Sequence, residues 1–104
     1  MTIEMRKGDT WPPLRATLVE ADGSPIDLSG ATVTFQMEDD NNNSVINSSA
    51  VIVSSSEGQV RYNWSSGDTD EVGTFEADFL VEFSSGKKAT VPNREYIPIY
   101  ITDH

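Results

Sequence analysis

The side-chain types that most often carry enzyme chemistry are scarce in this chain. Its only histidine, His104, is the last residue of the sequence, and a general base needs a ring that is held in a cleft. Cysteine is absent, which excludes a thiol nucleophile, a disulfide and a thiolate metal site. The serines have no internal histidine to activate them and no nucleophile-elbow motif around them, so we interpret them as loop residues. The sequence therefore predicts no catalytic residue, no cofactor and no enzymatic activity.

Clustered carboxylates are the remaining source of site chemistry, because calcium and similar hard cations prefer oxygen ligands. Two acidic runs contain such clusters: Asp68, Asp70 and Glu71 in one, and Asp39 and Asp40 with the amides Asn41 and Asn43 in the other. Neither run has the spacing of a complete calcium-loop motif, and acidic residues in exposed turns usually do no more than solvate them. We keep the run at 68–71 as a weak candidate for a cation and predict no established metal site.

Aromatic side chains outside the predicted core are candidates for a binding surface. Trp11 stands beside a diproline, and Tyr96 and Tyr100 lie on the face of the last predicted strand that its isoleucines do not occupy. Exposed rings of this kind suit a protein interface or a sugar-stacking face. Trp64 is instead assigned to the core, because it is in phase with the apolar residues of 60–64.

The elements that must position these side chains have the two-residue period of β-strands. In residues 75–83 every second side chain is apolar, and acidic residues and Leu80 stand between them, so one face is predicted to be buried. Residues 31–37 repeat the pattern and are the predicted partner strand. Shorter runs predict strands at 3–5, 14–18, 45–53, 59–64, 89–91 and 96–102. Since no segment has apolar residues at helical spacing, the residues alone predict an all-β sandwich or barrel with essentially no helix.

The buried face of residues 75–83 needs a second layer to cover it. We expect its rings to pack against neighbouring strands: Phe75, Phe79 and Phe83 against Val33, Phe35, Tyr62 and Trp64. Prolines mark two places where strand pairing changes. The break at 8–13 predicts a kink or a switch between sheets. Pro98, which has no amide proton, predicts that the last strand lies at a sheet edge or leaves one side unpaired.

Length and charge limit the organisation and the partners. The chain has 104 residues with no linker or repeat that divides it, so we predict a single domain over residues 1–104. Its net charge of −10 repels phosphate backbones and anionic lipids, so neither nucleic acid nor a membrane is an expected partner. Residues 1–7 lack the apolar core of a signal peptide, and no run is long enough to span a membrane. Synthesis in the cytoplasm is expected.

Several short motifs occur in an order that resembles a known family. They are Gly8-Asp9-Thr10, Pro12-Pro13-Leu14, the run from Asp22 to Phe35, the run from Gly58 to Trp64, Gly67-Asp68-Thr69, the run from Gly73 to Phe79, and Pro92-Asn93. Together they resemble the N-terminal domain of the upper baseplate proteins of lactococcal phages, a domain common in tailed viruses, over residues 8–101. The resemblance implies an immunoglobulin-like antiparallel β-sandwich of about 7–9 strands, a structural role in a virion and no catalytic residues.

The function expected from this resemblance is that of a non-enzymatic virion structural protein of a bacteriophage. It would be made in the host cytoplasm and bind other virion structural proteins, in multiple copies within a symmetric assembly. The baseplate, the tail, the neck and a capsid-decoration position all remain open. The alternative is a carbohydrate- or host-surface-binding β-sandwich module, in which the exposed rings of Trp11 and Tyr100 would contact the ligand.

Overall fold

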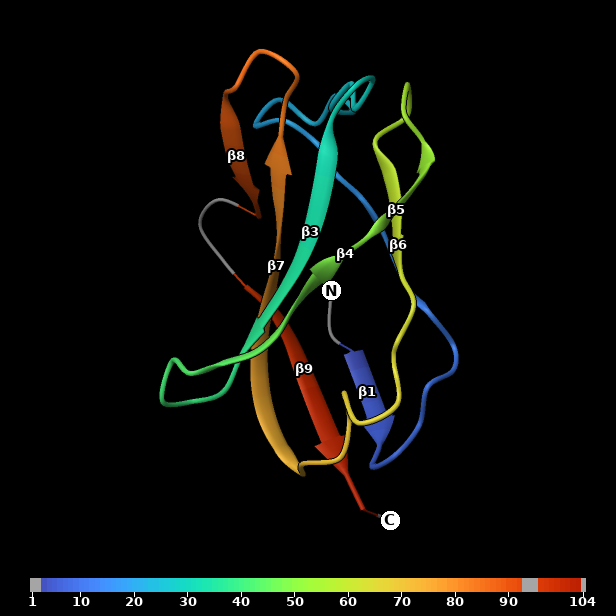
Figure 1. Cartoon of the computed structure of the whole chain (residues 1–104), viewed down its shortest axis with the longest axis vertical. Helices are drawn as coiled ribbons and strands as arrows, with labels where there is room; N and C mark the ends of the chain where they lie inside the picture. The colour runs from blue at the N-terminus through green and yellow to red at the C-terminus, as the bar shows by residue number, and fades with distance from the viewer. Residues whose placement is uncertain (1–2, 93–95, 104) are drawn as a thin grey trace.

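The computed structural model describes residues 3–92 and 96–103, and within these ranges it contains nine β-strands and no helix (Figure 1). The strands are β1 (Ile3–Arg6), β2 (Leu14–Thr17), β3 (Thr32–Glu38), β4 (Ser44–Ser49), β5 (Val51–Ser54), β6 (Gln59–Tyr62), β7 (Gly73–Glu82), β8 (Lys88–Val91) and β9 (Ile97–Thr102). The predicted all-β class is confirmed. The described residues include no helix that is long and apolar enough to cross a membrane.

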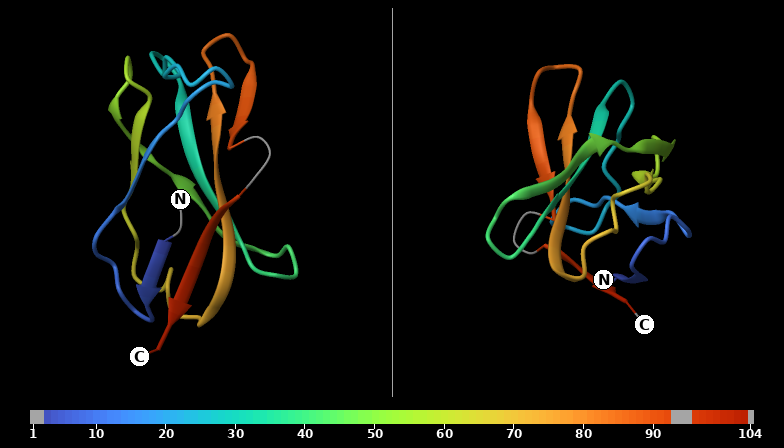
Figure 2. Two further views of the ribbon diagram at one scale, coloured as in Figure 1. Left: turned by 180° about the vertical axis from the view of Figure 1, so that it is seen from behind. Right: turned by 60° about the horizontal axis from the view of Figure 1, so that its bottom comes forward.

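The strands form two layers of unequal size (Figure 2). Sheet A has six strands in the order β1-β9-β7-β3-β4, with β8 pairing to β7 as well, and sheet B has three in the order β2-β6-β5. The predicted antiparallel β-sandwich is confirmed with one exception among the described strand pairs. β1 pairs with β9 in parallel, from Ile3 opposite Ile99 to Arg6 opposite Thr102. Parallel neighbours need a long connection, and here nearly the whole chain provides it.

The centre of sheet A is the antiparallel pair of β3 and β7, as the sequence predicts. Phe35 lies opposite Phe79 and Val33 opposite Val81, and all four side chains are buried. Because side chains alternate between the two faces of a strand, a slip by one residue would expose this set. The match of the two buried patterns therefore determines the register.

The chain passes between the two layers four times, and two of these crossings lie where the sequence predicts a break or irregular strands. After β1 in sheet A it passes through residues 7–13 and enters β2 in sheet B, which confirms the predicted switch at the diproline. Residues 44–54, predicted as one or two irregular strands, form β4 in sheet A and β5 in sheet B. Ala50 stands between them, and its amide donates to the carbonyl oxygen of Val33 at 2.9 Å. At each of these crossings the main chain itself connects a strand of sheet A to a strand of sheet B.

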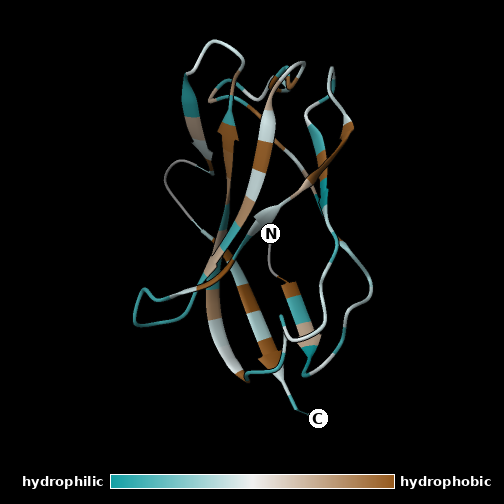
Figure 3. Cartoon of the chain, in the orientation of Figure 1, coloured by the Kyte–Doolittle hydropathy of each residue, from teal (hydrophilic) through white to brown (hydrophobic). Residues whose placement is uncertain are grey.

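Phe35 is the centre of an aromatic cluster that joins the two layers. Its ring stacks on Tyr62 with centroids 4.3 Å apart, meets Trp64 edge-on at 5.7 Å, and lies 5.4 Å from Phe79. Tyr62 belongs to sheet B, so the stacked pair spans the space between the sheets. The predicted packing of Phe79 against Phe35 is confirmed. Phe75 is buried in the same core, and Phe83 is only partly buried at its margin. Hydrophobic and hydrophilic residues also alternate along β1 and β9 of sheet A (Figure 3).

Pro98 lies within sheet A. On one side it pairs with Glu76 of β7, and on the other the described pairing with β1 starts one residue later, at Ile99. The strand is therefore not an edge strand, but at Pro98 its second side has no partner within residues 3–92 and 96–103. This is the second of the two predicted arrangements.

Candidate assembly surfaces

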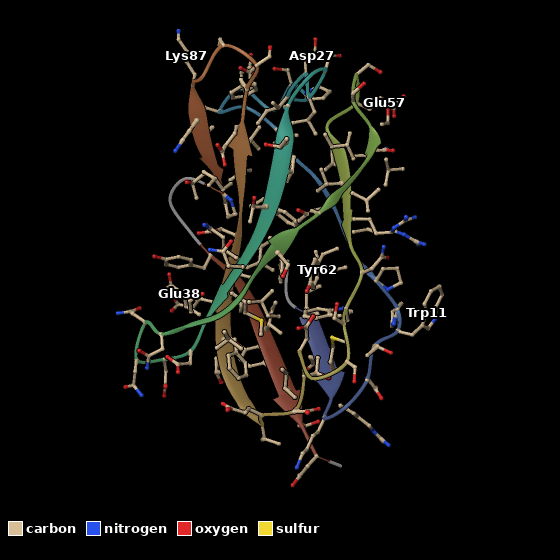
Figure 4. The ribbon with its side chains drawn as sticks, in the orientation of Figure 1. Trp11, Asp27, Glu38, Glu57, Tyr62 and Lys87 are labelled. Carbon is tan, nitrogen blue, oxygen red and sulfur yellow. The ribbon has the colours of Figure 1, made fainter. Side chains whose placement is uncertain are left out.

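The three aromatic candidates are on the surface, at separate places. Trp11 is 74% exposed and projects from the segment between β1 and β2 (Figure 4), beside a shallow hollow that Arg6 and Thr102 also line. Tyr96 is exposed just before β9 and lines a different hollow. Tyr100 pairs with Glu4 and with a residue of β7 on the outer face of sheet A. The structure therefore does not gather Trp11 and Tyr96 in one binding hollow.

The carboxylate of Asp68 takes part in the fold. Its Oδ2 accepts a hydrogen bond from the hydroxyl of Tyr62 at 2.5 Å and one from the amide of Ser65 at 2.8 Å. Burial of the ring, followed by this contact with Asp68, raises the pKa of Tyr62. The next residue, Thr69, is buried and donates through Oγ1 to the carbonyl oxygen of Asp9 at 2.8 Å. The segment at 65–69 thus fixes the end of the aromatic cluster against the loop that follows β1.

The second acidic run is used in the same way. Oδ1 of Asp39 accepts from the amides of Asn41 and Asn43, each at 2.9 Å, and these bonds lower the pKa of the Asp39 carboxyl. Among the described residues, no three or more His, Cys, Asp or Glu side chains come together in a group that could hold a metal ion. The geometry of both runs is that of hydrogen-bonded turns.

A groove that the sequence does not reveal runs between the edge of sheet B and the β8 side of sheet A. Two adjoining hollows share Val19, Val91 and Pro92 in their lining, and Phe83 and Tyr96 lie along them. Sheet B has three strands and sheet A six, so the smaller sheet leaves part of the larger one uncovered. The lining residues are far apart in the sequence, and only the strand order brings them together.

The outer face of sheet A is acidic. Glu38 and Glu76 are cross-strand partners, and Asp78 lies opposite Gln36 one step along the same face. Oδ1 of Asp78 is enclosed by protein and has no hydrogen-bond partner among the residues that the structure describes. Burial, and then the charge of Glu38, raises the pKa of Asp78. This carboxylate is therefore less favourable in the folded protein than in the unfolded chain.

We expect Asp78→Asn to stabilise the protein at pH 7. The amide removes a partly buried negative charge beside Glu38, so the free energy of unfolding should rise by up to about 1 kcal/mol, a modest gain because solvent screens part of the charge. The raised pKa gives the sign of the pH dependence. The folded state binds the Asp78 proton more tightly, so the stability of the unsubstituted protein should rise as the pH falls from neutral towards the usual pKa of 3.8.

The measurement is urea unfolding at several pH values from 7 down to about 3 for Asp78→Asn and for a control, Glu76→Gln. Glu76 is exposed on the same strand, so its substitution removes an equal charge with little change in burial. Below pH 3.8 the opposite trend should appear in all proteins, because hydrogen bonds lower the pKa values of Asp22, Asp27 and Asp39. If Asp78→Asn were less stable than the unsubstituted protein at pH 7, the Asp78 carboxylate would not be destabilising in the folded state.

The family described as BppU N-terminal domain matches residues 2–96. The chain belongs to this family. Membership confirms the resemblance inferred from the order of the short motifs, and it supports a structural role in the virion of a tailed phage. A comparison with curated proteins gave no significant match.

Among solved structures, the N-terminal domain of phage TP901-1 ORF48 is similar to this chain, with a TM-score of 0.73 and 19% identity, over 99% of this chain and 86% of that one. CopC from Methylosinus trichosporium OB3b is also similar, with a TM-score of 0.57 and 11% identity, over 99% of this chain and 85% of that one. At these identities the likeness concerns the fold of the BppU N-terminal domain and not a binding site.

Proposed function

We propose that this protein is a non-enzymatic structural component of a tailed-phage virion and acts by binding other virion proteins. The observation that carries the proposal is the family match over residues 2–96. The described carboxylate runs are engaged in turns, which leaves them poorly placed for general acid–base work. We further propose that the protein is made in the host cytoplasm and is present in multiple copies in a symmetric assembly, on a baseplate, tail, neck or capsid surface. Neither nucleic acid nor a membrane is a proposed partner.

Trp11 is the side chain we propose as an anchor of this binding. It is 74% exposed, and tryptophan is among the residues that most often dominate interface energetics. Since so little of the ring is buried in the isolated chain, Trp11→Ala should change the free energy of unfolding by no more than about 0.5 kcal/mol. Its effect on assembly should be much larger than its effect on stability.

The test is quantitative mass spectrometry of purified particles from phage that carry the unsubstituted gene or Trp11→Ala. We expect a fixed number of copies of the unsubstituted protein per particle, and a clear loss of copies for Trp11→Ala with an unchanged melting temperature. Val72→Ala is a control, because Val72 is 52% exposed and leaves the aromatic candidates intact. Particles without any of the unsubstituted protein would refute the structural role.

A carbohydrate- or host-surface-binding module is the second candidate, and the exposed indole of Trp11 is the observation that favours it. A glycan array separates the two functions. The structural proposal predicts no selective glycan binding. The module predicts selective binding that Trp11→Ala or Tyr100→Ala abolishes.

A further inference from the structure

The outer face of sheet B has an unusual charge for this protein. Its strands β2, β5 and β6 contain no aspartate or glutamate, although the chain has 17 acidic residues and only 7 lysines and arginines. Two of those basic residues, Arg15 and Arg61, lie on this face. The sheet is therefore a basic surface on a strongly acidic molecule.

Arg15 and Arg61 are direct cross-strand partners in the pair of β2 and β6. Like charges directly opposite each other destabilise a sheet, so the folded chain alone gains nothing from this arrangement. Arg61 is also incompletely satisfied, because its Nε is buried and has no hydrogen-bond partner among the residues described. Guanidinium groups can bind carboxylates through two parallel hydrogen bonds, so two arginines at directly opposed positions on an outer face suit carboxylate recognition.

Apolar side chains complete the surface. Val51 lies opposite Arg61 in the pair of β5 and β6 and is 41% exposed, and Val53 is 54% exposed. Val53 also lines a shallow hollow together with Arg15 and Arg61. A surface of arginines beside exposed apolar groups has the composition of a protein interface, in which arginine is enriched.

We propose that the outer face of sheet B, formed by Arg15, Arg61, Val51 and Val53, binds an acidic surface of a different virion protein, whose carboxylates pair with the two guanidinium groups. This inference rests on the structural role proposed above and adds the surface and the chemistry of the partner. Charge complementarity carries it, because this is a carboxylate-free sheet in a protein of net charge −10.

Two other occupants fit less well. A second copy could meet this face through the same face, but that would oppose arginine to arginine. A second copy could also bind through the acidic outer face of its sheet A. The outer faces of sheets A and B lie on opposite sides of the sandwich, so contacts of this kind would repeat from copy to copy into an open stack. Nucleic acid is disfavoured as the partner because the net negative charge of the protein repels phosphate backbones. In addition, the exposed valine side chains have no hydrogen-bond donor that could bind a phosphate.

Arg15→Glu tests the proposal, because stability and binding should change in opposite directions. The new carboxylate faces Arg61 across the strand pair, so the melting temperature should stay the same or rise. Docking on an acidic partner should be lost. In particles from phage carrying this variant, quantitative mass spectrometry should find the copy number reduced by about tenfold or more, as for reversal of a charged anchor.

Two further variants make the result specific. Val53→Asp adds a negative charge to the same face at an exposed position and should reduce the copy number in the same way. Lys87→Glu makes the same charge change as Arg15→Glu, but at an exposed position just before β8 of sheet A, and should leave the copy number unchanged.

Three outcomes would overturn the inference. One is a normal copy number for Arg15→Glu in particles that contain the unsubstituted protein normally, which refutes this surface and leaves the structural role intact. Another is an equal loss for Lys87→Glu, which would indicate a general effect of charge. The third is binding of the purified protein to a DNA duplex of about 30 base pairs at low salt that Arg15→Glu abolishes, which would make nucleic acid the occupant. Absence of the unsubstituted protein from particles would instead refute the proposed function.

Discussion

Phe35→Ala is expected to lower the free energy of unfolding by about 4 kcal/mol, near the middle of the range for truncation of a buried phenylalanine. The side chain is 0% exposed and contacts the rings of Tyr62, Trp64 and Phe79. Its loss would remove the stacked contact with sheet B and the ring contact with β7 together. The cavity would lie between two sheets whose backbones are fixed by their ladders, so neighbouring side chains could fill little of it.

Phe83→Ala is the matched control for this prediction. The same atoms are removed, but Phe83 is only partly buried at the margin of the core, so we expect a cost of about 1–2 kcal/mol. Urea unfolding followed by tryptophan fluorescence measures both, since Trp64 lies in the cluster. Similar costs for the two variants would show that Phe35 is not the centre of the core.

The sequence predicts the centre of the fold because burial there follows a local pattern. Phe35 and Phe79 each lie in an alternating run, and only one register buries both sets. The switch between sheets near Pro12 is predictable for a similar reason, because proline ends strand pairing through its own covalent structure. What the pattern does not indicate is which buried ring is central. That depends on the position of Tyr62 in the opposite layer.

Pairings between distant segments are beyond this kind of reasoning. The parallel contact of β1 with β9 joins the two ends of the described chain, and nothing in either run distinguishes a parallel partner from an antiparallel one. Arg15 and Arg61 are unremarkable in the sequence, and they become a basic surface only through the pairing of β2 with β6. The groove along Val19 and Val91 likewise depends on the strand order.

The acidic turns are ambiguous in the sequence for a different reason. Closely spaced aspartates suit a cation, but they also suit a turn in which the carboxylate accepts backbone amide protons. Asp39 and Asp68 accept such bonds at 2.8–2.9 Å. The two possibilities differ only in where the side chain points, and the residue types do not determine that direction.

Gly58→Ala is expected to destabilise the protein by about 3 kcal/mol or more, through a clash added to backbone strain. Gly58 precedes β6 and has φ of +67°, a conformation that costs other residues roughly 1–2 kcal/mol. A Cβ atom there would lie 2.5 Å from the carbonyl oxygen of Leu18 and 3.1 Å from that of Ile26. Backbone atoms cannot rotate away as a flexible side chain can, so the segment would have to move.

That movement would break the hydrogen bonds that hold the segment after β2 in place. The amide of Leu18 donates to the carbonyl oxygen of Gly58 at 2.7 Å, and the amide of Ile26 donates to that of Leu18 at 2.9 Å. Gly86→Ala is the control, since Gly86 also has positive φ, at +90°, but no atom lies within 4 Å of its added Cβ. Thermal unfolding should show a loss of about 1 kcal/mol for Gly86→Ala, from backbone strain alone. If Gly58→Ala were no worse than this control, the close backbone contact between residue 58 and the segment after β2 would be wrong.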